Sequence, residues 1–231
     1  MDFFGNKFLV LAITFAAFMV GKIIQNRTKS VVLNPILIAI ILIICYLEIA
    51  DVSYATYSEG GDLIAFWLKP AVVALGVPLY MQLQTIKKQI VPIMVSTFVG
   101  CFVGIASAVL TAKMLGASDE IALSLAPKSV TTPIAMEVSE SIGGIPSLTA
   151  AVVVIVGIFG AIFGFKILEI GKIKNPISQG LSMGTASHAV GTSKAMEVSP
   201  HYGAFSSLGL ILNGIMTAIL APIVLKLMGM L

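Results

Sequence analysis

Long apolar runs separated by short polar stretches fill the first half of the chain. About 20 residues of helix span the hydrocarbon core of a bilayer, so four of these runs each predict one membrane-crossing helix. The runs are Phe8–Val20, Val31–Ile49, Leu63–Leu83 and Ile90–Leu115. Asn34-Pro35 predicts the start of the second helix, because proline favours the first helical turn. Lys69, in the third run, is expected to reach either the outer surface or a central cavity.

From Ser118 onward the apolar pattern is interrupted twice. The first interruption has two arms, Ser118–Pro127 and Ile134–Ile142, each only about 15 Å long as helix and therefore too short to cross a bilayer. The second covers Pro176–Ser199, with its tip expected near His188–Lys194. Ordinary helices are predicted after each interruption, at 146–170 and 203–227.

The two interruptions are copies of one pattern. Ala135–Ser139 and Ala195–Ser199 have the same sequence, sixty positions apart, and Lys128 aligns with His188. A polar, glycine- and proline-containing segment that recurs inside a membrane protein is typical of a transporter's binding site. We therefore interpret the pair as two halves of one substrate site.

The charges between the runs predict how the chain is oriented in the membrane. Cations cluster after the first and third runs, and acids lie between the second and third. The positive-inside rule therefore predicts an N-terminus outside the cell. The cations are Lys22, Arg27, Lys29, Lys87 and Lys88, and the acids are Glu48, Asp51, Glu59 and Asp62.

The positive-inside rule also indicates whether the first interruption crosses the membrane or dips into it and returns. If 118–142 dips into the membrane and returns outside, Lys166, Lys172 and Lys174 become cytoplasmic, whereas a single crossing places them outside. The rule favours two re-entrant hairpins of opposite orientation, an inverted repeat, with single-span broken helices as the alternative. The predicted fold is an all-α membrane protein of about six transmembrane helices plus these hairpins. Residues 1–231 form a single domain, in which 1–117 are mainly scaffold and 118–231 are the transport region.

Composition agrees with a membrane protein. Apolar residues make up 58% of the chain and charged residues 11%, with a mean hydropathy of +1.03. The net charge of +3 and the lack of a basic tract give no indication of nucleic-acid binding. Neither catalytic nor nucleotide-binding motifs appear, and the two cysteines have no ligand-like spacing, so neither an enzyme nor a metal site is expected. Coupling to H⁺ or Na⁺ stays open.

Cations, one imidazole and several hydroxyls at the tips suit a small anion, above all a carboxylate. The candidate substrate-binding residues are Lys128, Ser129, Thr131, Thr132, Ser187, His188, Thr192, Ser193, Lys194 and Asn213. The candidate hinge and gate residues are Pro133, Gly143, Gly144, Pro146, Gly191, Glu137 and Glu197.

Each candidate also has a purely structural interpretation. Glu137 or Glu197 could neutralise Lys128, and Lys194 could extend to the cytoplasmic surface. His188 could hydrogen-bond its own loop or carry a coupling proton. The hydroxyls could cap broken helix ends, and Asn213 could line the cavity or bridge helices.

Several motifs together resemble the LrgB/CidB family over nearly the whole chain. They are Leu125–Met136 (LAPKSVTTPIAM), Ser141–Pro146 (SIGGIP), Met183–Thr192 (MGTASHAVGT) and Gly203–Leu208 (GAFSSL). Each motif is weak alone, and their combination is highly specific.

The resemblance implies a fold of inverted repeats and two kinds of function. Bacterial members are described as antiholin-like proteins that modulate murein hydrolase export and autolysis with a small LrgA/CidA-type membrane partner. Bacterial relatives are also linked to pyruvate uptake, and plastid relatives to glycolate and glycerate transport. The main hypothesis is a secondary transporter of small monocarboxylates by alternating access, and the alternative is an antiholin-like regulator. A pore-forming protein is a weaker third. A homodimer in the bacterial cytoplasmic membrane is expected.

Overall fold

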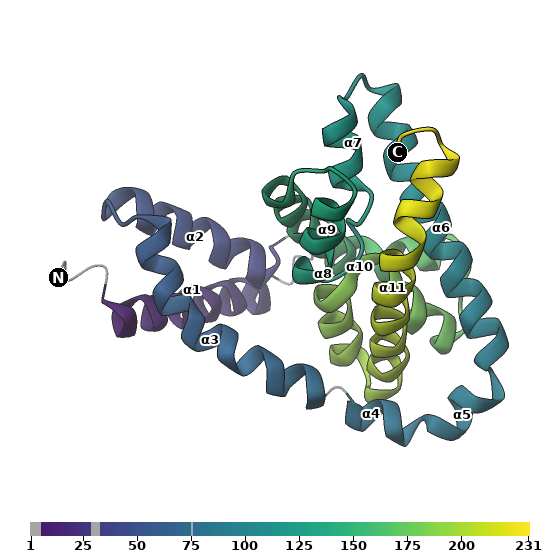
Figure 1. Ribbon diagram of the computed structural model, residues 1–231. Helices are drawn as coiled ribbons and strands as arrows, with labels where there is room; N and C mark the ends of the chain where they lie inside the picture. The colour runs from purple at the N-terminus through teal and green to yellow at the C-terminus, as the bar shows by residue number, and fades with distance from the viewer. Residues whose placement is uncertain (1–5, 29–32, 75) are drawn as a thin grey trace. The chain divides into compact units, whose positions relative to one another are not determined.

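The computed structural model describes residues 6–28, 33–74 and 76–231, and this part of the chain is helical (Figure 1). It separates into two compact units, 1–75 and 76–231. Helices α1 (Lys7–Thr28), α2 (Pro35–Ile49) and α3 (Tyr54–Ala74) belong to the first. The second contains α4 (Gly76–Met81), α5 (Leu83–Lys88), α6 (Ile90–Met114), α7 (Asp119–Leu125), α8 (Thr132–Ser141), α9 (Pro146–Ile170), α10 (Pro176–Val198) and α11 (Pro200–Leu227).

In the first unit α1 packs against α2 and α3. The predicted start of α2 is confirmed: Asn34 caps the helix, its side chain accepting a 2.8 Å hydrogen bond from the Ile36 amide, with Pro35 in the first turn. The run predicted as one helix over 63–83 covers parts of α3, all of α4 and the first residue of α5, with a turn at Gln82 between α4 and α5. Leu75, between α3 and α4, and the side chain of Lys69 lie outside the described residues, as do Val31 and Val32.

Four helices in the described part of the chain are long and apolar enough to cross a membrane: α1, α6, α9 and α11. The prediction of a multi-pass, all-α membrane protein is confirmed at that level. Helix α2 is apolar but has only 15 residues, because Asn34-Pro35 starts it late. Helix α3 carries Glu59 and Asp62 and is not among these four.

The first interruption is a short helix, a break and a second short helix. Residues 126–131 separate α7 from α8, close to the predicted arms. After α8 the chain returns to the last turn of α7, where the Ile145 amide donates to Ser124 Oγ at 2.7 Å. Thr149 Oγ1 lies 2.9 Å from the Ser124 carbonyl oxygen and 2.7 Å from Ser139 Oγ. These hydroxyls are fully buried and tie α7, α8 and α9 together.

Two glycines make this return possible. Gly143 has φ +82°, a conformation that residues with a Cβ rarely adopt. A Cβ on Gly144 would lie 2.5 Å from Ser139 Oγ and 2.9 Å from the Ser124 amide nitrogen. The local geometry therefore requires glycine at both positions, whereas their predicted role as hinges stays a prediction.

The second interruption is a break inside α10. Ser187 (φ −128°, ψ 16°) and His188 (φ 43°, ψ −137°) leave the helical conformation. A Cβ on Gly191 would lie 2.7 Å from the Met183 carbonyl oxygen, although eight residues of straight helix rise about 12 Å. The chain therefore turns back on itself at this break. The break lies at the start of the predicted tip, and the rest of that tip is helical.

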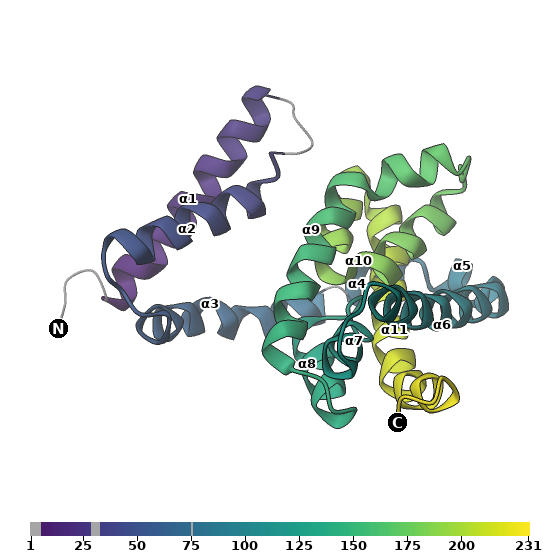
Figure 2. The same ribbon diagram turned by 90° about the horizontal axis from the view of Figure 1, so that it is seen from above.

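Both arms of α10 pack on α11 (Figure 2). The first arm runs alongside α11 in the same direction, since Gly180 meets Tyr202 and Gly184 meets Ser206. The second arm runs in the opposite direction, since Thr192 meets Ser206 and Met196 meets Gly203. Whether the arms re-enter one face of a bilayer stays a prediction.

Candidate functional site

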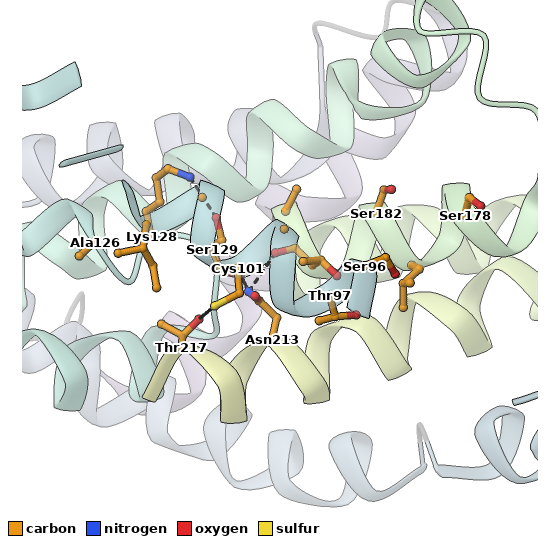
Figure 3. Close-up of a pocket in the computed structure, with 16 residues that line it drawn as sticks. Ser96, Thr97, Cys101, Ala126, Lys128, Ser129, Ser178, Ser182, Asn213 and Thr217 are labelled. Carbon is orange, nitrogen blue, oxygen red and sulfur yellow. Dashed lines mark hydrogen bonds between the residues drawn. The ribbon is translucent and has the colours of Figure 1, made fainter. Parts of the chain in front are cut away.

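A cavity of about 300 Å³ lies between the first break, the first arm of α10, α6 and α11 (Figure 3). The segment between α7 and α8 contributes Ala126, Lys128 and Ser129. Small and polar side chains from the three helices complete the lining: Ser96, Thr97, Gly100, Cys101 and Gly104 on α6, Ser178, Ser182, Thr185 and Ala186 on α10, and Asn213 and Thr217 on α11, with apolar contacts from Ile105 and Leu181.

Lys128 is the one cationic side chain of this lining. It is half-buried and donates a 3.1 Å hydrogen bond to Ser129 Oγ. The ion pairs found among the described residues are Lys7–Glu59, Lys113–Asp119 and Lys194–Glu197, so Lys128 is not neutralised by a carboxylate there. In particular, Glu197 is occupied by Lys194 at 2.7 Å. A bound anion would supply the missing charge.

Three buried oxygen atoms of the cavity lining have no hydrogen-bond partner. They are Thr97 Oγ1, Thr185 Oγ1 and Asn213 Oδ1. Buried polar atoms in native proteins are nearly always paired, and a group left unpaired costs about 1–3 kcal/mol. Each has almost no accessible surface, so these oxygens are buried behind the cavity wall rather than exposed to its interior.

Asn213 connects the first break to the first arm of α10. Its Nδ2 donates to the Ser129 carbonyl oxygen at 3.1 Å and to the Thr185 carbonyl oxygen at 2.9 Å. Asn213 is 2% exposed and also lines the cavity, so it both bridges segments and faces the site. The two roles weighed for it from the sequence occur together.

His188 bonds to a different helix rather than to its own loop. Its Nε2 lies 2.8 Å from the Val153 carbonyl oxygen on α9. Glycines on α9 allow this approach: a Cβ on Gly157 would lie 2.6 Å from His188 Nε2, and a Cβ on Gly160 would overlap the Ser187 side chain. The broken part of α10 is thus held against α9 by close packing.

A second, more apolar groove of about 420 Å³ lies beside the first cavity, between α9 and α10. Lys128, Ser182 and Ala186 contribute to both cavities. Ser187 lines the groove together with apolar side chains such as Phe159. Lys128 therefore stands between a polar cavity and an apolar groove.

The predicted site residues divide into two groups. Lys128, Ser129 and Asn213 line the polar cavity, and Lys128 and Ser187 line the groove. The remaining candidates line neither of these two cavities: Thr131, Thr132, His188, Thr192, Ser193 and Lys194. Several of these make structural bonds, such as Thr192 Oγ1 to the His188 carbonyl oxygen at 2.9 Å and Ser193 Oγ to the Ala189 carbonyl oxygen at 3.0 Å.

The predicted hinge and gate residues line neither of the two cavities. Glu137 and Glu197 are exposed, Pro133 is in the first turn of α8 and Pro146 in that of α9. Gly191 is buried where α10 folds back. These positions are compatible with gating, which stays a prediction.

Sequence reasoning missed the contribution of α6 and of the first arm of α10. Ser96, Thr97 and Cys101 lie inside an apolar run that predicts only a crossing helix. A signal was present, because Thr97, Gly100, Cys101 and Gly104 are three or four residues apart and so share one small, weakly polar helix face.

Comparison with known proteins identifies relatives over the full length. The chain is 39% identical to an uncharacterized protein of Haemophilus influenzae, covering 95% of each chain. It is 37% identical to the holin-like protein CidB of Staphylococcus epidermidis, covering 98% of this chain and 99% of the relative. It is 34% identical to the antiholin-like protein LrgB of Bacillus subtilis, covering 97% of each. No solved structure gives a significant match.

The resemblance noted from the motifs is therefore confirmed by independent comparison. Residues 14–227 match the LrgB-like family, which is nearly the whole chain and includes both broken segments and every residue of the cavity lining. With full-length relatives named CidB and LrgB, this bacterial-type multi-pass membrane protein belongs to the LrgB/CidB family.

Proposed function

We propose that this protein is a secondary transporter that carries a small monocarboxylate, with the substrate bound in the polar cavity beside Lys128. The observation that supports this most is a cation without a carboxylate partner among the described residues, in a cavity lined mainly by small and polar side chains. An unpaired ammonium is costly at membrane depth and marks a functional site by default.

The chemistry of the lining favours an anion. A carboxylate accepts hydrogen bonds and carries negative charge, while Lys128 offers an ammonium and Ser178 and Ser182 offer hydroxyl donors. The cavity volume of about 300 Å³ suits a compact ligand. Glycolate, glycerate, lactate and pyruvate belong to the proposed class.

An inverted repeat with alternating access is part of the proposal. It is supported by the sequence repeat and by two reciprocal contacts. His188, in the second break, contacts Val153 on α9, the helix that follows the first break. Asn213, on α11, the helix that follows the second break, contacts Ser129 in the first break. Val153 and Asn213 are themselves sixty positions apart, as are Lys128 and His188. Such an exchange is expected of two halves related by a pseudo-two-fold axis.

The proposal also includes the membrane orientation of the protein, its partners and its coupling ion. The charge distribution supports an N-terminus outside the cell. A homodimer, an LrgA/CidA-type partner and coupling to H⁺ or Na⁺ follow from the family resemblance alone.

Proteoliposomes containing the purified chain provide the direct test. Labelled lactate or pyruvate should accumulate in them above the level in empty vesicles. Cys101 supplies a second readout, because it lines the cavity while the exposed Cys45 does not. In a Cys45→Ser variant, millimolar substrate should slow alkylation of Cys101 by a small thiol reagent. Absence of both flux and protection would contradict the proposal.

The names of the relatives support a second candidate more directly than they support transport. Holin-like CidB and antiholin-like LrgB indicate a membrane protein that influences cell lysis through holin-like partners. This candidate predicts no solute flux by the purified chain. It also predicts that the lysis phenotype of cells is retained when the charge of Lys128 is removed. A transporter instead predicts that removing this charge abolishes both solute flux and the lysis phenotype.

A further inference from the structure

We propose that the apolar groove between α9 and α10 binds the anion of a fatty acid, with its carboxylate at Lys128 and its acyl chain along α9. The groove and the charge of Lys128 are sufficient for such binding, which requires no solute flux. It therefore adds a second ligand class and is tested separately from the proposed transport function.

The groove is long and mostly apolar. Its lining follows α9 from Ile155 to Leu168, which is about 20 Å of helix. Apart from Lys128, the lining consists of apolar residues, glycines and the two serines Ser182 and Ser187. A three-carbon acid would leave most of this apolar surface uncovered, whereas an extended acyl chain covers it.

The groove is open to the surroundings of α9. Ile155, Phe159 and Ile167 line it and are 65%, 55% and 52% exposed. Helix α9 is long and apolar enough to cross a membrane, so these exposed apolar side chains are expected to face hydrocarbon. A ligand can therefore enter the groove sideways from the bilayer, where acyl chains are abundant.

Lys128 selects an occupant that carries negative charge. It is the one charged side chain of the groove lining and has no carboxylate partner among the described residues. A neutral acyl chain packed against it would leave the ammonium without a counter-charge in apolar surroundings, which is costly. A carboxylate supplies that charge and accepts a hydrogen bond from the ammonium.

The size of the groove favours one acyl chain over two. Its volume of about 420 Å³ lies near the lower end of the range of about 300–1,000 Å³ for sites that enclose small ligands. A phospholipid has two chains and a larger headgroup, and one cation matches the single charge of a carboxylate. The occupant is therefore a fatty acid anion rather than a phospholipid.

Quenching of tryptophan fluorescence by a brominated fatty acid tests this inference. The chain has a single tryptophan, so Trp67→Phe provides a background without this fluorescence. Phe159→Trp then places a reporter in the groove. Phe102→Trp on α6 is the matched control. Both positions lie within one residue of the middle of a 25-residue helix, and Phe102 is 41% exposed but lines neither cavity.

Full-length variants in nanodiscs of zwitterionic lipid are titrated with the acid and with its uncharged methyl ester. We expect half-maximal quenching of Phe159→Trp at about tenfold lower acid concentration than that of Phe102→Trp, because only the groove offers a charge-assisted contact. The ester should quench both reporters at similar concentrations. Adding Lys128→Met should remove the difference between the reporters, whereas adding Lys194→Met should preserve it.

Equal quenching of both reporters by the acid would overturn the inference, whether the acid is merely dissolved in the bilayer or a second copy of the chain covers the groove. A preference for the groove that the ester shares, or stronger quenching by a brominated anionic phospholipid, would also overturn it. If Phe159→Trp fails to fold, a photoreactive fatty acid is applied to the unaltered protein. Labelling of α9 or α10 that the unlabelled acid but not its ester prevents would support the inference, and labelling spread evenly over α6, α9 and α11 would overturn it.

Discussion

At the scale of single residues, two side chains of the same type have different expected roles when only one of them lines a cavity. Lys128 and Lys194 are both predicted from the sequence to bind substrate, yet Lys128 lines both cavities and Lys194 pairs with Glu197 at 2.7 Å. An exposed pair of that kind contributes about 0–1 kcal/mol. The two lysines should therefore respond differently to loss of charge.

Lys128→Met should remove ligand binding without weakening the fold. Methionine keeps the length of the side chain and removes a charge that is costly to bury unpaired, so thermal unfolding in detergent should occur at the same or a higher temperature. Loss of a charge-assisted contact should weaken carboxylate binding about 10- to 100-fold. Equilibrium binding of labelled lactate measures this effect.

Lys194→Met is the matched control for that substitution. Because Lys194 lines neither cavity, its loss should change affinity less than about threefold. If Lys128→Met instead lowers the unfolding temperature and leaves binding intact, Lys128 is a structural cation and the site assignment is wrong.

At the scale of elements, small residues decide how closely the broken helices approach their neighbours. Three glycines along one side of α9 meet α10: Gly157 meets His188, Gly160 meets Ser187 and Gly164 meets Met183. On α10 and α11, Gly184 and Gly209 allow similarly close contact. The sequence around the breaks is thus rich in glycine because backbone and polar side chains meet there without intervening apolar side chains.

Gly160→Ala should force α9 and α10 apart. The added methyl group would overlap the Ser187 side chain, which is itself only 3% exposed and packs closely on Gly191 as well. Overpacking of this kind costs about 1–3 kcal/mol, so we expect a clearly lower unfolding temperature and faster alkylation of Cys101. Gly61→Ala, where nothing lies within 4 Å of the new Cβ, should be neutral or slightly stabilising. Equal behaviour of the two variants would show that the α9–α10 contact is not tightly packed.

At the scale of the whole molecule, the site is completed within one compact unit. Every residue that lines the polar cavity or the apolar groove belongs to 76–231. Helix α6 lies in that unit and supplies part of the lining, although the prediction placed it with a scaffold over 1–117. The assignment of scaffold and transport roles to parts of the chain stays a prediction.

Membrane topology can be tested with one new cysteine. In a cysteine-free background, Lys174→Cys should react with a membrane-impermeant thiol reagent from the cytoplasmic side only, because a re-entrant first segment places the α9–α10 loop inside the cell. Asp51→Cys, in the α2–α3 loop, is predicted to react from outside and serves as the control. Labelling of Lys174→Cys from outside would show that the first broken segment crosses the membrane once.

The sequence by itself determined the class of protein, the positions of α1, α6, α9 and α11, and the two interruptions. These features depend on local composition: apolar runs must be helical in a bilayer, and the polar stretch that contains Pro127 and Pro133, together with the glycines after α8, interrupts the apolar pattern. The repeat of Ala135–Ser139 in Ala195–Ser199 lies outside the lining of the polar cavity, and its link to a substrate site stays a prediction.

Only the tertiary structure decided which polar residues share a cavity. Thr97, Cys101 and Thr217 are far from the breaks in sequence, and His188 proved to bond Val153 rather than line either cavity. The physical reason is that the direction of a side chain at a helix break depends on the φ and ψ angles of one or two residues, here Ser187 and His188. Those angles are set by packing against α9 and α11, contacts that the local sequence does not contain.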